Sequence, residues 1–363
     1  MQSSMADLTT LHVGGRIDTL LRPESRSELI DAVRSCDQRG IPIVIVGGGS
    51  NTVAADEPVS GTVIHVANKG ITASSDSCGG AWVEVGAGES WESLVQRAIA
   101  EEWVGIEALS GIPGYVGATP MQNVGAYGQE VAEVIARVET YDRVTGDVRT
   151  WAAGECDFGY RSSLFKRSQV ESLPATDPLI SQSRLRYVVL SVAFQFTTGN
   201  LGAPVTYGPL AKALGVAVGE RVPSRSVREA VLELRRSKGM VLDSSDHDTW
   251  SVGSFFVNPI VPVRLLSNLP ADAPRWETGA DVVKLSAAWL VEQAGFTPGF
   301  CLTGRPQAAL STKHTLAITN RGGATAADVL ALAQAIQTGV WQQFGVWLTP
   351  EPAVLGRTDQ LTR

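Results

Sequence analysis

Two glycine-rich segments of the sequence have the composition of loops that bind phosphate groups. The first, GGGSN at 47–51, directly follows the apolar run IPIVIV. Small residues after a strand leave backbone amides free to face a pyrophosphate, although a plain tight turn explains this segment equally well. The second, residues 105–128, is rich in glycine and contains two prolines, which excludes a regular helix or a central strand. Long loops of this kind are usually functional, and two of them in one domain suit a large dinucleotide such as FAD.

Arg161 is the first of three isolated side chains that could act on a reacting group. It follows Phe158 and Tyr160 in FGYRSSLFK, so packing against aromatic rings could hold its guanidinium toward a carboxylate. Taken alone, the segment favours an ordinary surface arginine.

Ser254 and Glu351 are the other two. Ser254 lies between Gly253 and two phenylalanines in GSFFVNP, with no base close to it in the sequence. A lone serine is usually structural, because its hydroxyl is so weak an acid that it protonates only a strongly basic carbon, such as a carbanion-like centre. Glu351 lies between Pro350 and Pro352, whose rings restrict the backbone and aim the carboxyl group. The hexapeptide TPEPAV alone favours a solvated glutamate.

The composition restricts the kinds of ligand and of site. The chain has 363 residues, 44% of them hydrophobic and 18% charged, enough for two or three packed domains. Its net charge of −7 disfavours a protein that coats nucleic-acid phosphates, so an anionic ligand needs local positive groups. We find no signal-peptide pattern and no apolar run near the roughly 20 residues of a membrane span, which predicts a cytoplasmic protein. The dispersed cysteines and histidines predict reduced thiols and no metal site: Cys36, Cys78, Cys156, Cys301, His12, His65, His247 and His314.

The elements that must position these residues alternate between helix and strand in the first 200 residues. Residues 24–39 place Leu29, Ile30 and Val33 on one helical face, and residues 90–103 predict a helix capped by Ser90. Strand-like runs lie at 41–46, 61–67, 81–88, 134–143 and 186–196. We therefore expect an α+β domain that opens with a βαβ-like unit.

The pattern changes after residue 215. Amphipathic spacing predicts helices over 226–239, 281–296 and 325–345, the last with Thr325 and Asp328 as a capping pair. A boundary near 215–225 follows. We expect parts at 1–70, 71–215 and 220–345, with 346–363 packing on the first.

Seven segments, in this order, resemble the UDP-N-acetylenolpyruvylglucosamine reductase (UDP-N-acetylmuramate dehydrogenase) family from about residue 10 to residue 355. They are IVGGGSN, SGIPGYVGATPMQNVGAYG, FGYRSSLFK, VTYGPL, VGSFFVNP, VKLSAAWLVEQAGF and VWLTPEP. VTYGPL is also similar to the class that carries an inserted tyrosine loop near the substrate. The resemblance implies a two-part FAD-binding domain of the vanillyl-alcohol-oxidase/PCMH type, at 1–70 and 71–215, and a smaller α+β substrate-binding domain at 220–345.

The resemblance also implies the activity. The family reduces the enolpyruvyl ether of UDP-N-acetylglucosamine to UDP-N-acetylmuramate in peptidoglycan precursor synthesis, with non-covalent FAD carrying hydride from NADPH to the vinyl carbon. Negative charge develops at the adjacent carbon and spreads into the substrate carboxylate. The expected partners are this sugar nucleotide and NADPH, without nucleic acid, membrane insertion or an obligate protein partner.

Matching positions imply the site residues. Arg161 matches the arginine that stabilises the charge, Glu351 the glutamate that assists it in protonated form, and Ser254 the serine that protonates the carbanion-like carbon. Substrate-anchoring positions match Tyr160, Tyr207, Lys238 and Asn258, the last three at the UDP portion. FAD-binding positions match Gly47, Gly48, Gly49, Ser50, Asn51, Ile112, Pro113, Gly114, Gly117, Ala118, Thr119, Asn123, Gly125, Ala126 and Tyr127.

Two departures from the family pattern affect the UDP end. Val257 stands where relatives often have lysine, which removes one possible phosphate contact. Gly239-Met240 replaces a proline-containing turn after Lys238, which leaves the position of that lysine less defined. Lys238 also fits a structural C-cap, because a cation is favoured at the end of a helix.

Two other interpretations stay open. An oxidase of the wider flavoprotein fold with covalent FAD would need a histidine or cysteine beside the flavin, for which His65 and Cys78 are the candidates. The other is a non-catalytic sugar-nucleotide or flavin-binding protein, against which the presence of Arg161, Ser254 and Glu351 together argues. The sequence indicates no oligomeric state, and the NADPH preference comes from the family alone.

Overall fold

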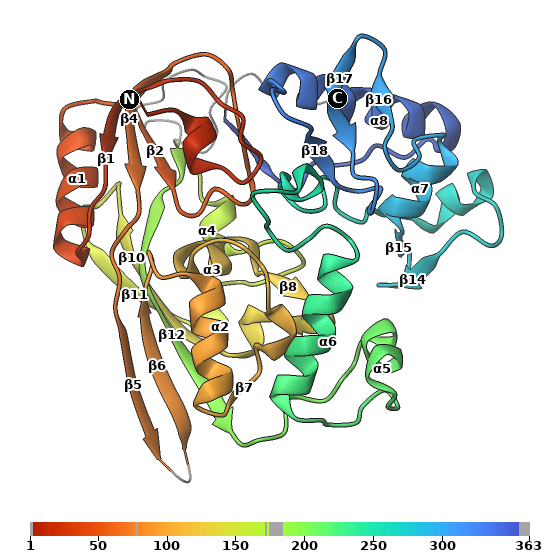
Figure 1. The fold of residues 1–363 in the computed structure, drawn as a ribbon. Coiled ribbons are helices and arrows are strands. Elements are labelled where there is room, and N and C mark those ends of the chain that lie inside the picture. The colour runs from red at the N-terminus through yellow and green to blue at the C-terminus, as the bar shows by residue number, and fades with distance from the viewer. Residues whose placement is uncertain (1–2, 77–78, 171–172, 174–183, 356–363) are drawn as a thin grey trace. The chain divides into compact units, whose positions relative to one another are not determined.

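The computed structural model describes residues 3–76, 79–170, 173 and 184–355, which form two compact units (Figure 1). Unit 1 comprises Met1–Arg16, Ser50–Pro58 and Leu242–Arg363, and unit 2 comprises Ile17–Gly49 and Val59–Val241. Cys78 and the tail after residue 355 lie outside the described residues. The division into parts 1–70, 71–215 and 220–345 stays a prediction.

Unit 2 begins with a parallel three-stranded sheet. Its order is β1 (Ile17–Leu21), β4 (Val59–His65) and β2 (Ile43–Val46). Helix α1 (Arg26–Gln38) joins β1 to β2 and buries Leu29, Ile30 and Val33, while Ser25 accepts a hydrogen bond from the amide of Glu28 at its start. This confirms the βαβ-like opening.

A larger antiparallel sheet forms the centre of unit 2. Its strands, in spatial order, are β11 (Val148–Ala152), β10 (Ile135–Asp142), β12 (Tyr187–Thr198), β6 (Gly80–Gly86) and β5 (Ile71–Asp76). Helix α2 (Trp91–Ala100) packs on it through Trp91 and Leu94, whose side chains share a core with Phe194 (Figure 1). Ser90 caps this helix by accepting a hydrogen bond from the amide of Ser93, as predicted.

Helix α2 is shorter than predicted. It ends at Ala100, and Glu102 has a left-handed backbone (φ 56°). Trp103 instead begins β7 (Trp103–Val104), pairs with β12 and stacks on Phe196 with ring centroids 5.9 Å apart. Burial of this ring against the sheet outweighs continuation of the helical pattern.

The glycine-rich segment contains only short elements. They are the 3₁₀ turns Glu107–Leu109 and Val116–Ala118, helix α3 (Thr119–Gln122), and strand β8 (Gly125–Ala126), which pairs with β9 (Gln129–Glu130). This part of unit 2 also contains two more 3₁₀ turns (Val131–Glu133 and Ala153–Glu155), helix α4 (Leu164–Arg167), helix α5 (Gly208–Leu214) and helix α6 (Ser224–Arg236). One four-residue helix is therefore the longest regular element between 105 and 128.

Unit 1 is built around the 19-residue helix α8 (Ala326–Phe344). Its capping box joins Thr325 and Asp328, as predicted, and its apolar face packs on β17 (Arg305–Leu310), β18 (Ile318–Asn320) and α7 (Ala287–Gln293) (Figure 1). The remaining strands are β16 (Cys301–Leu302) on β17, β13 (Ile260–Pro262) and β14 (Arg275–Glu277) on either side of β15 (Val282–Leu285), and β19 (Ala353–Leu355) parallel to β3 (Thr52–Ala54).

The single helix predicted over 281–296 is wrong in its first half. Residues 282–285 form strand β15, in which Val283 and Leu285 are buried, and the helix begins only after Ser286, whose side chain accepts from the amide of Trp289. A strand buries every second residue, as Val283 and Leu285 show, while Val282 and Leu285, three residues apart, also fit one face of a helix. The α+β class itself is confirmed. None of the described helices is long and apolar enough to cross a membrane.

Candidate active site

The two glycine-rich loops meet in unit 2. A Cβ atom added at Gly48 would lie 2.7 Å from the Cα of Gly114, and one at Gly47 would lie 3.6 Å from the ring of Tyr115. No side chain fits between the two backbones at Gly48. The adjacent backbones therefore form one surface of small residues, as a cradle for a dinucleotide requires. The unit boundary follows Gly49, so that Ser50 and Asn51 belong to unit 1.

The second loop is fixed along its length by backbone hydrogen bonds. The amide of Val116 donates to Glu89, and that of Gly117 donates to Ala87, at 2.9 Å each. A Cβ at Gly117 would lie 2.5 Å from the Cβ of Ala87, so glycine is required at this approach. The rest of the predicted FAD-binding residues in this loop run through the turn and α3 to β8: Ile112, Pro113, Ala118, Thr119, Asn123, Gly125, Ala126 and Tyr127.

A buried carboxylate holds the base of this loop. Glu107, 1% exposed, accepts hydrogen bonds from the amide of Gly105 at 2.7 Å and from the side chain of Gln129 at 2.9 Å. It also accepts from the amide of Ala203, which precedes the predicted tyrosine loop. Glu107 therefore links both ends of the glycine-rich segment to the segment that carries Tyr207.

Three residues at this site have left-handed backbones although none is glycine. They are Asn123 (φ 44°), Tyr127 (φ 52°) and Arg161 (φ 54°). Such residues cost free energy and concentrate at functional sites. The side chain of Asn123, 2% exposed, compensates by bonding to Glu130, to the carbonyl of Gly159 and to the amide of Ala132.

Arg161 points at the glycine-rich loop. One guanidinium nitrogen donates to the carbonyl of Gly125 at 2.7 Å, and the group lies 5.4 Å from the ring centroid of Tyr160. The arginine is half-buried, in contrast to the ordinary surface position that its sequence alone favours. A fixed cation is therefore present beside the cradle of unit 2.

The predicted substrate tyrosines and Lys238 also lie in unit 2. Tyr207 is the residue before α5 and contacts Tyr127 edge-on, with ring centroids 5.7 Å apart. Burial raises the pKa of Tyr127. Tyr160 and Tyr207 are 40% and 39% exposed, so both rings can meet a ligand. Lys238 lies two residues beyond the end of α6, half-buried, rather than at the last turn of the helix.

Ser254 and Glu351 are brought together in unit 1. The amide of Glu351 donates to the carbonyl of Phe255 at 2.8 Å, and Val257 donates to Thr349 at 3.1 Å, so the two segments run side by side. Strand β19 continues from Glu351 and pairs with β3, and the amide of Ala353 donates to the carbonyl of Asn51. Both side chains are half-buried.

One residue beside Ser254 was missed in the sequence. Nε2 of His314 lies 3.4 Å from Oγ of Ser254. His314 belongs to the polar run STKHT between β17 and β18, and that run was the only signal for it.

A structural role is visible for Asn258, whose side-chain oxygen accepts a hydrogen bond from the amide of Ala287 at the start of α7. That bond leaves its NH₂ group as the donor toward a ligand.

His65, the candidate for a covalent flavin link, is buried in unit 2. Its ring stacks on Tyr115 with centroids 5.7 Å apart, and burial lowers the pKa of the imidazole. Its Nδ1 atom is buried without a hydrogen-bond partner. A buried nitrogen without a hydrogen-bond partner, beside Gly47 and Tyr115, is consistent with a ligand site.

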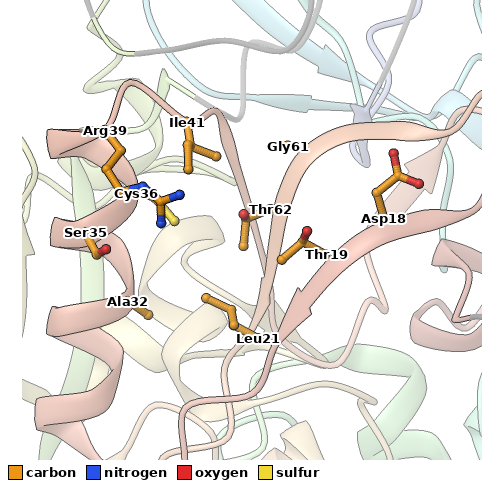
Figure 2. A pocket seen from close by; sticks show the side chains of 10 residues that line it. All are labelled: Asp18, Thr19, Leu21, Ala32, Ser35, Cys36, Arg39, Ile41, Gly61 and Thr62. Atoms are coloured by element: carbon orange, nitrogen blue, oxygen red, sulfur yellow. The ribbon is translucent and has the colours of Figure 1, made fainter.

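A surface depression lies elsewhere in unit 2. About 450 Å³ in volume, it lies between α1 and the strands β1 and β4, lined among others by Thr19, Cys36 and Thr62 (Figure 2). None of the predicted site residues lines it.

Two family models match the chain. Residues 17–151 match the FAD binding domain, and residues 245–355 match the C-terminal domain of UDP-N-acetylenolpyruvoylglucosamine reductase.

Relatives match along almost the whole chain. A UDP-N-acetylenolpyruvoylglucosamine reductase of Cutibacterium acnes is 49% identical over 98% of this chain and 89% of its own length. Another such reductase, of Thermobifida fusca, is 46% identical over 98% of this chain and 97% of its own length. The crystal structure of a UDP-N-acetylenolpyruvylglucosamine reductase from Thermus caldophilus, 24% identical, covers 98% of both chains with a TM-score of 0.63 and shows the same fold.

Proposed function

The chain belongs to the UDP-N-acetylenolpyruvoylglucosamine reductase family, and on that premise we propose which of its residues carry out the reduction. The reaction converts the enolpyruvyl ether of UDP-N-acetylglucosamine to UDP-N-acetylmuramate for peptidoglycan synthesis. NADPH is the electron source and FAD the prosthetic group. The observation that carries the assignment of residues is the pairing of the Ser254 and Glu351 segments.

The cradle in unit 2 fits FAD. Its backbones approach so closely at Gly48 and Gly114 that no Cβ fits, and His65 beside it has an unsatisfied ring nitrogen. We propose that the 47–51 and 112–127 loops hold the cofactor through backbone amides. FAD, when bound, supplies the substrate vinyl carbon with the hydride that it received from NADPH.

Arg161 and Glu351 stabilise the charge that this transfer creates. Once the vinyl carbon gains hydride, negative charge develops at the neighbouring carbon and spreads into the substrate carboxylate. A guanidinium suits a carboxylate because it donates two parallel hydrogen bonds. Arg161 is already held by Gly125 and stacked near Tyr160, so little ordering is needed when the charge appears. Glu351, in protonated form, donates to the same charge.

Ser254 completes the reaction by giving its hydroxyl proton to the carbanion-like carbon. Most groups are too weakly basic to take a proton from a serine hydroxyl, but a carbanion-like carbon is basic enough. Gly253, with a left-handed backbone (φ 77°), precedes it, and the backbone bonds of Phe255 hold the segment in place.

Tyr207, Lys238 and Asn258 are proposed to bind the UDP portion, and Tyr160 to support Arg161. The exposed rings and the lysine ammonium suit a uracil face and a diphosphate, respectively. Val257 offers the diphosphate no charge. The proposal includes a cytoplasmic location, which the scattered, unpaired cysteines Cys36, Cys156 and Cys301 support, and function without an obligate protein partner.

The purified protein tests the assignment. It should be yellow and should oxidise NADPH only when UDP-N-acetylenolpyruvoylglucosamine is present, with UDP-N-acetylmuramate as the product. Acid precipitation should release the flavin intact. Flavin retained on the precipitated chain would favour the covalent oxidase, and colourless protein without turnover would favour a non-catalytic binding protein.

A further inference from the structure

The loop that carries His314 makes two contacts with the segment of Ser254. Oγ of Ser254 and Nε2 of His314 are 3.4 Å apart, and the amide of Phe255 donates to the carbonyl of Leu316 at 2.7 Å. The segment of Ser254 therefore has the His314 loop on one side, while the carbonyl of Phe255 binds Glu351 on the other.

The loop that carries His314 is closed on itself. The amide of Ser311 donates to the carbonyl of Ala317 at 2.8 Å, and the amide of Ala317 donates to the carbonyl of His314 at 3.1 Å. The hydroxyl of Thr315 donates to Glu292 in α7 at 2.9 Å. These bonds leave the backbone at His314 little freedom.

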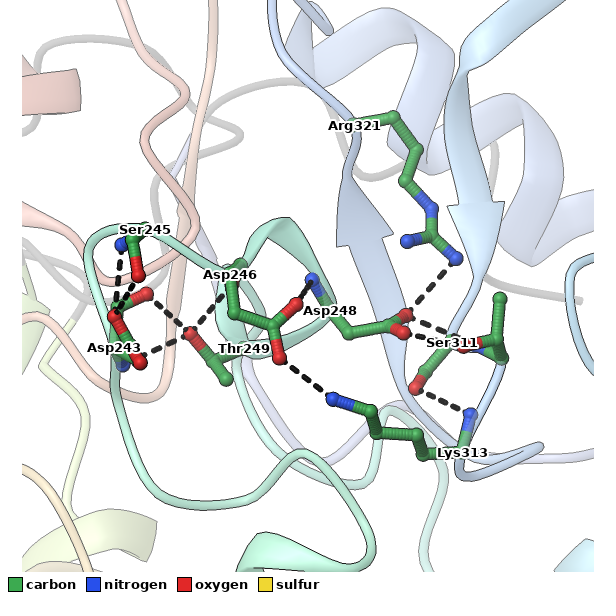
Figure 3. A network of polar contacts seen from close by, with 9 residues as sticks. Asp243, Ser245, Asp246, Asp248, Thr249, Ser311, Lys313 and Arg321 are labelled. Carbon is green, nitrogen blue, oxygen red and sulfur yellow. Dashed lines mark hydrogen bonds and ion pairs between the residues drawn. The ribbon is translucent and has the colours of Figure 1, made fainter.

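A charged network fixes the start of the same loop (Figure 3). The carboxylate of Asp248 accepts from the amide and the hydroxyl of Thr312 and pairs with Arg321 at 2.9 Å, while Asp246 pairs with Lys313 at 2.6 Å. Asp248 is 5% exposed, and such partly buried pairs are stronger than pairs in water. The network therefore holds the start of the loop, at Thr312 and Lys313, in place.

We propose that His314 positions the Ser254 hydroxyl for proton transfer, an inference that rests on the proposed role of Ser254. The Nε2–H group of His314 donates to Oγ of Ser254 and occupies one of its two lone pairs. A hydroxyl has a single proton, so a neighbour that accepted it would turn it away from the substrate. A neighbour that donates leaves this proton free to face the reacting carbon.

The same bond stabilises what the transfer leaves behind. The O–H bond of Ser254 breaks, its proton forms the new C–H bond with the substrate carbanion, and its electron pair stays on Oγ. The Nε2–H donor stabilises this alkoxide, as hydrogen bonds to an ionised acceptor are about twice as strong as neutral ones. Water then returns a proton to Oγ. His314 itself gains and loses no proton, so it is a positioning residue.

Transient kinetics of the complete flavoprotein test this inference. His314→Leu should slow protonation of the substrate about tenfold, the effect of one lost hydrogen bond, with flavin reduction by NADPH and the melting temperature unchanged. His314→Gln, whose amide can present an N–H at a similar position, should recover to within about threefold of the wild type. In a Ser254→Ala background, His314→Leu should cause no further loss.

Several results would overturn the inference. Wild-type protonation in His314→Leu, failure of His314→Gln to restore the rate, or multiplying losses in the double variant would each do so. If Ser254→Ala alone protonates normally, the proposed role of Ser254 fails and the inference falls with it. Nitrogen NMR of histidine-labelled wild type gives a check that needs no folded variant, because the His314 ring must carry its proton on Nε2. A bare Nε2 would contradict the proposal.

Discussion

The backbone amide of Glu351 donates a 2.8 Å hydrogen bond to the carbonyl of Phe255, the residue after Ser254. The amide of the same Phe255 donates to Leu316, two residues after His314. Three segments far apart in the sequence thus form one small backbone assembly in unit 1. These backbone bonds hold the proposed proton donor and the proposed glutamate in place independently of their side chains.

Arg161→Lys should lower kcat by roughly 10²–10³-fold, the range seen when one pre-placed charge-stabilising donor is lost. A lysine keeps the charge but loses the planar fork that binds a carboxylate and the bond to Gly125. Steady-state turnover with the enolpyruvyl substrate measures this. Arg149→Lys, at an exposed ion pair, is the matched control and should change nothing. Equal turnover of both variants would remove Arg161 from the mechanism.

Gly48→Ala should lower the amount of bound FAD. The new Cβ would lie 2.7 Å from the Cα of Gly114, so the backbones must separate and the cradle must change shape. Flavin absorbance per protein, read with the melting temperature, measures the loss. Gly154→Ala adds a Cβ with nothing within 4 Å and should retain full flavin content. Wild-type flavin content in Gly48→Ala would place the cofactor elsewhere.

Asp248→Asn should reduce the free energy of unfolding by about 1–3 kcal/mol at neutral pH, because Thr312 and Arg321 lose a charged partner. Burial opposes ionisation of Asp248, but the hydrogen bonds from Thr312 and the charge of Arg321 together lower its pKa. A lowered folded-state pKa stabilises the fold above the usual aspartate range near 3.9 and loses this effect as the pH falls through the folded value.

The difference in the free energy of unfolding between Asp248→Asn and wild type should therefore become smaller in acid. Denaturant unfolding at neutral pH and at progressively lower pH below about 4 measures it. The exposed Asp272→Asn should stay within about 0.5 kcal/mol of wild type throughout. A difference that grows on acidification would have the wrong sign for this network.

The start of a helix can be predicted from the sequence where a capping residue marks it. The capping pair of Thr325 and Asp328 identifies the start of α8, and Ser90 that of α2. Strand β15 was predicted as part of a helix because Val282 and Leu285 have helical spacing, whereas Val283 and Leu285 have the spacing of a strand. Its pairing with β13 and β14 decides between the two.

Some features of the candidate site can also be predicted from the sequence, whereas others depend on tertiary contacts. The glycine content of both loops predicts close backbone approach, which Gly48 and Gly114 show. The left-handed backbone of Arg161 and its bond to Gly125 depend on tertiary contacts and leave no trace in FGYRSSLFK. His314 was missed because its contact joins residues 60 positions apart, across strands whose pairing no short motif encodes.

Ser254→Ala separates the two halves of the reaction and tests the central claim most directly. In stopped-flow experiments NADPH should reduce its flavin at the wild-type rate, while UDP-N-acetylmuramate should form at least about 10²-fold more slowly. Ser267→Ala, at an exposed serine of the same unit, should match wild type in both halves. Wild-type product formation by Ser254→Ala would contradict the account, since the substrate carbon would then take its proton from another group.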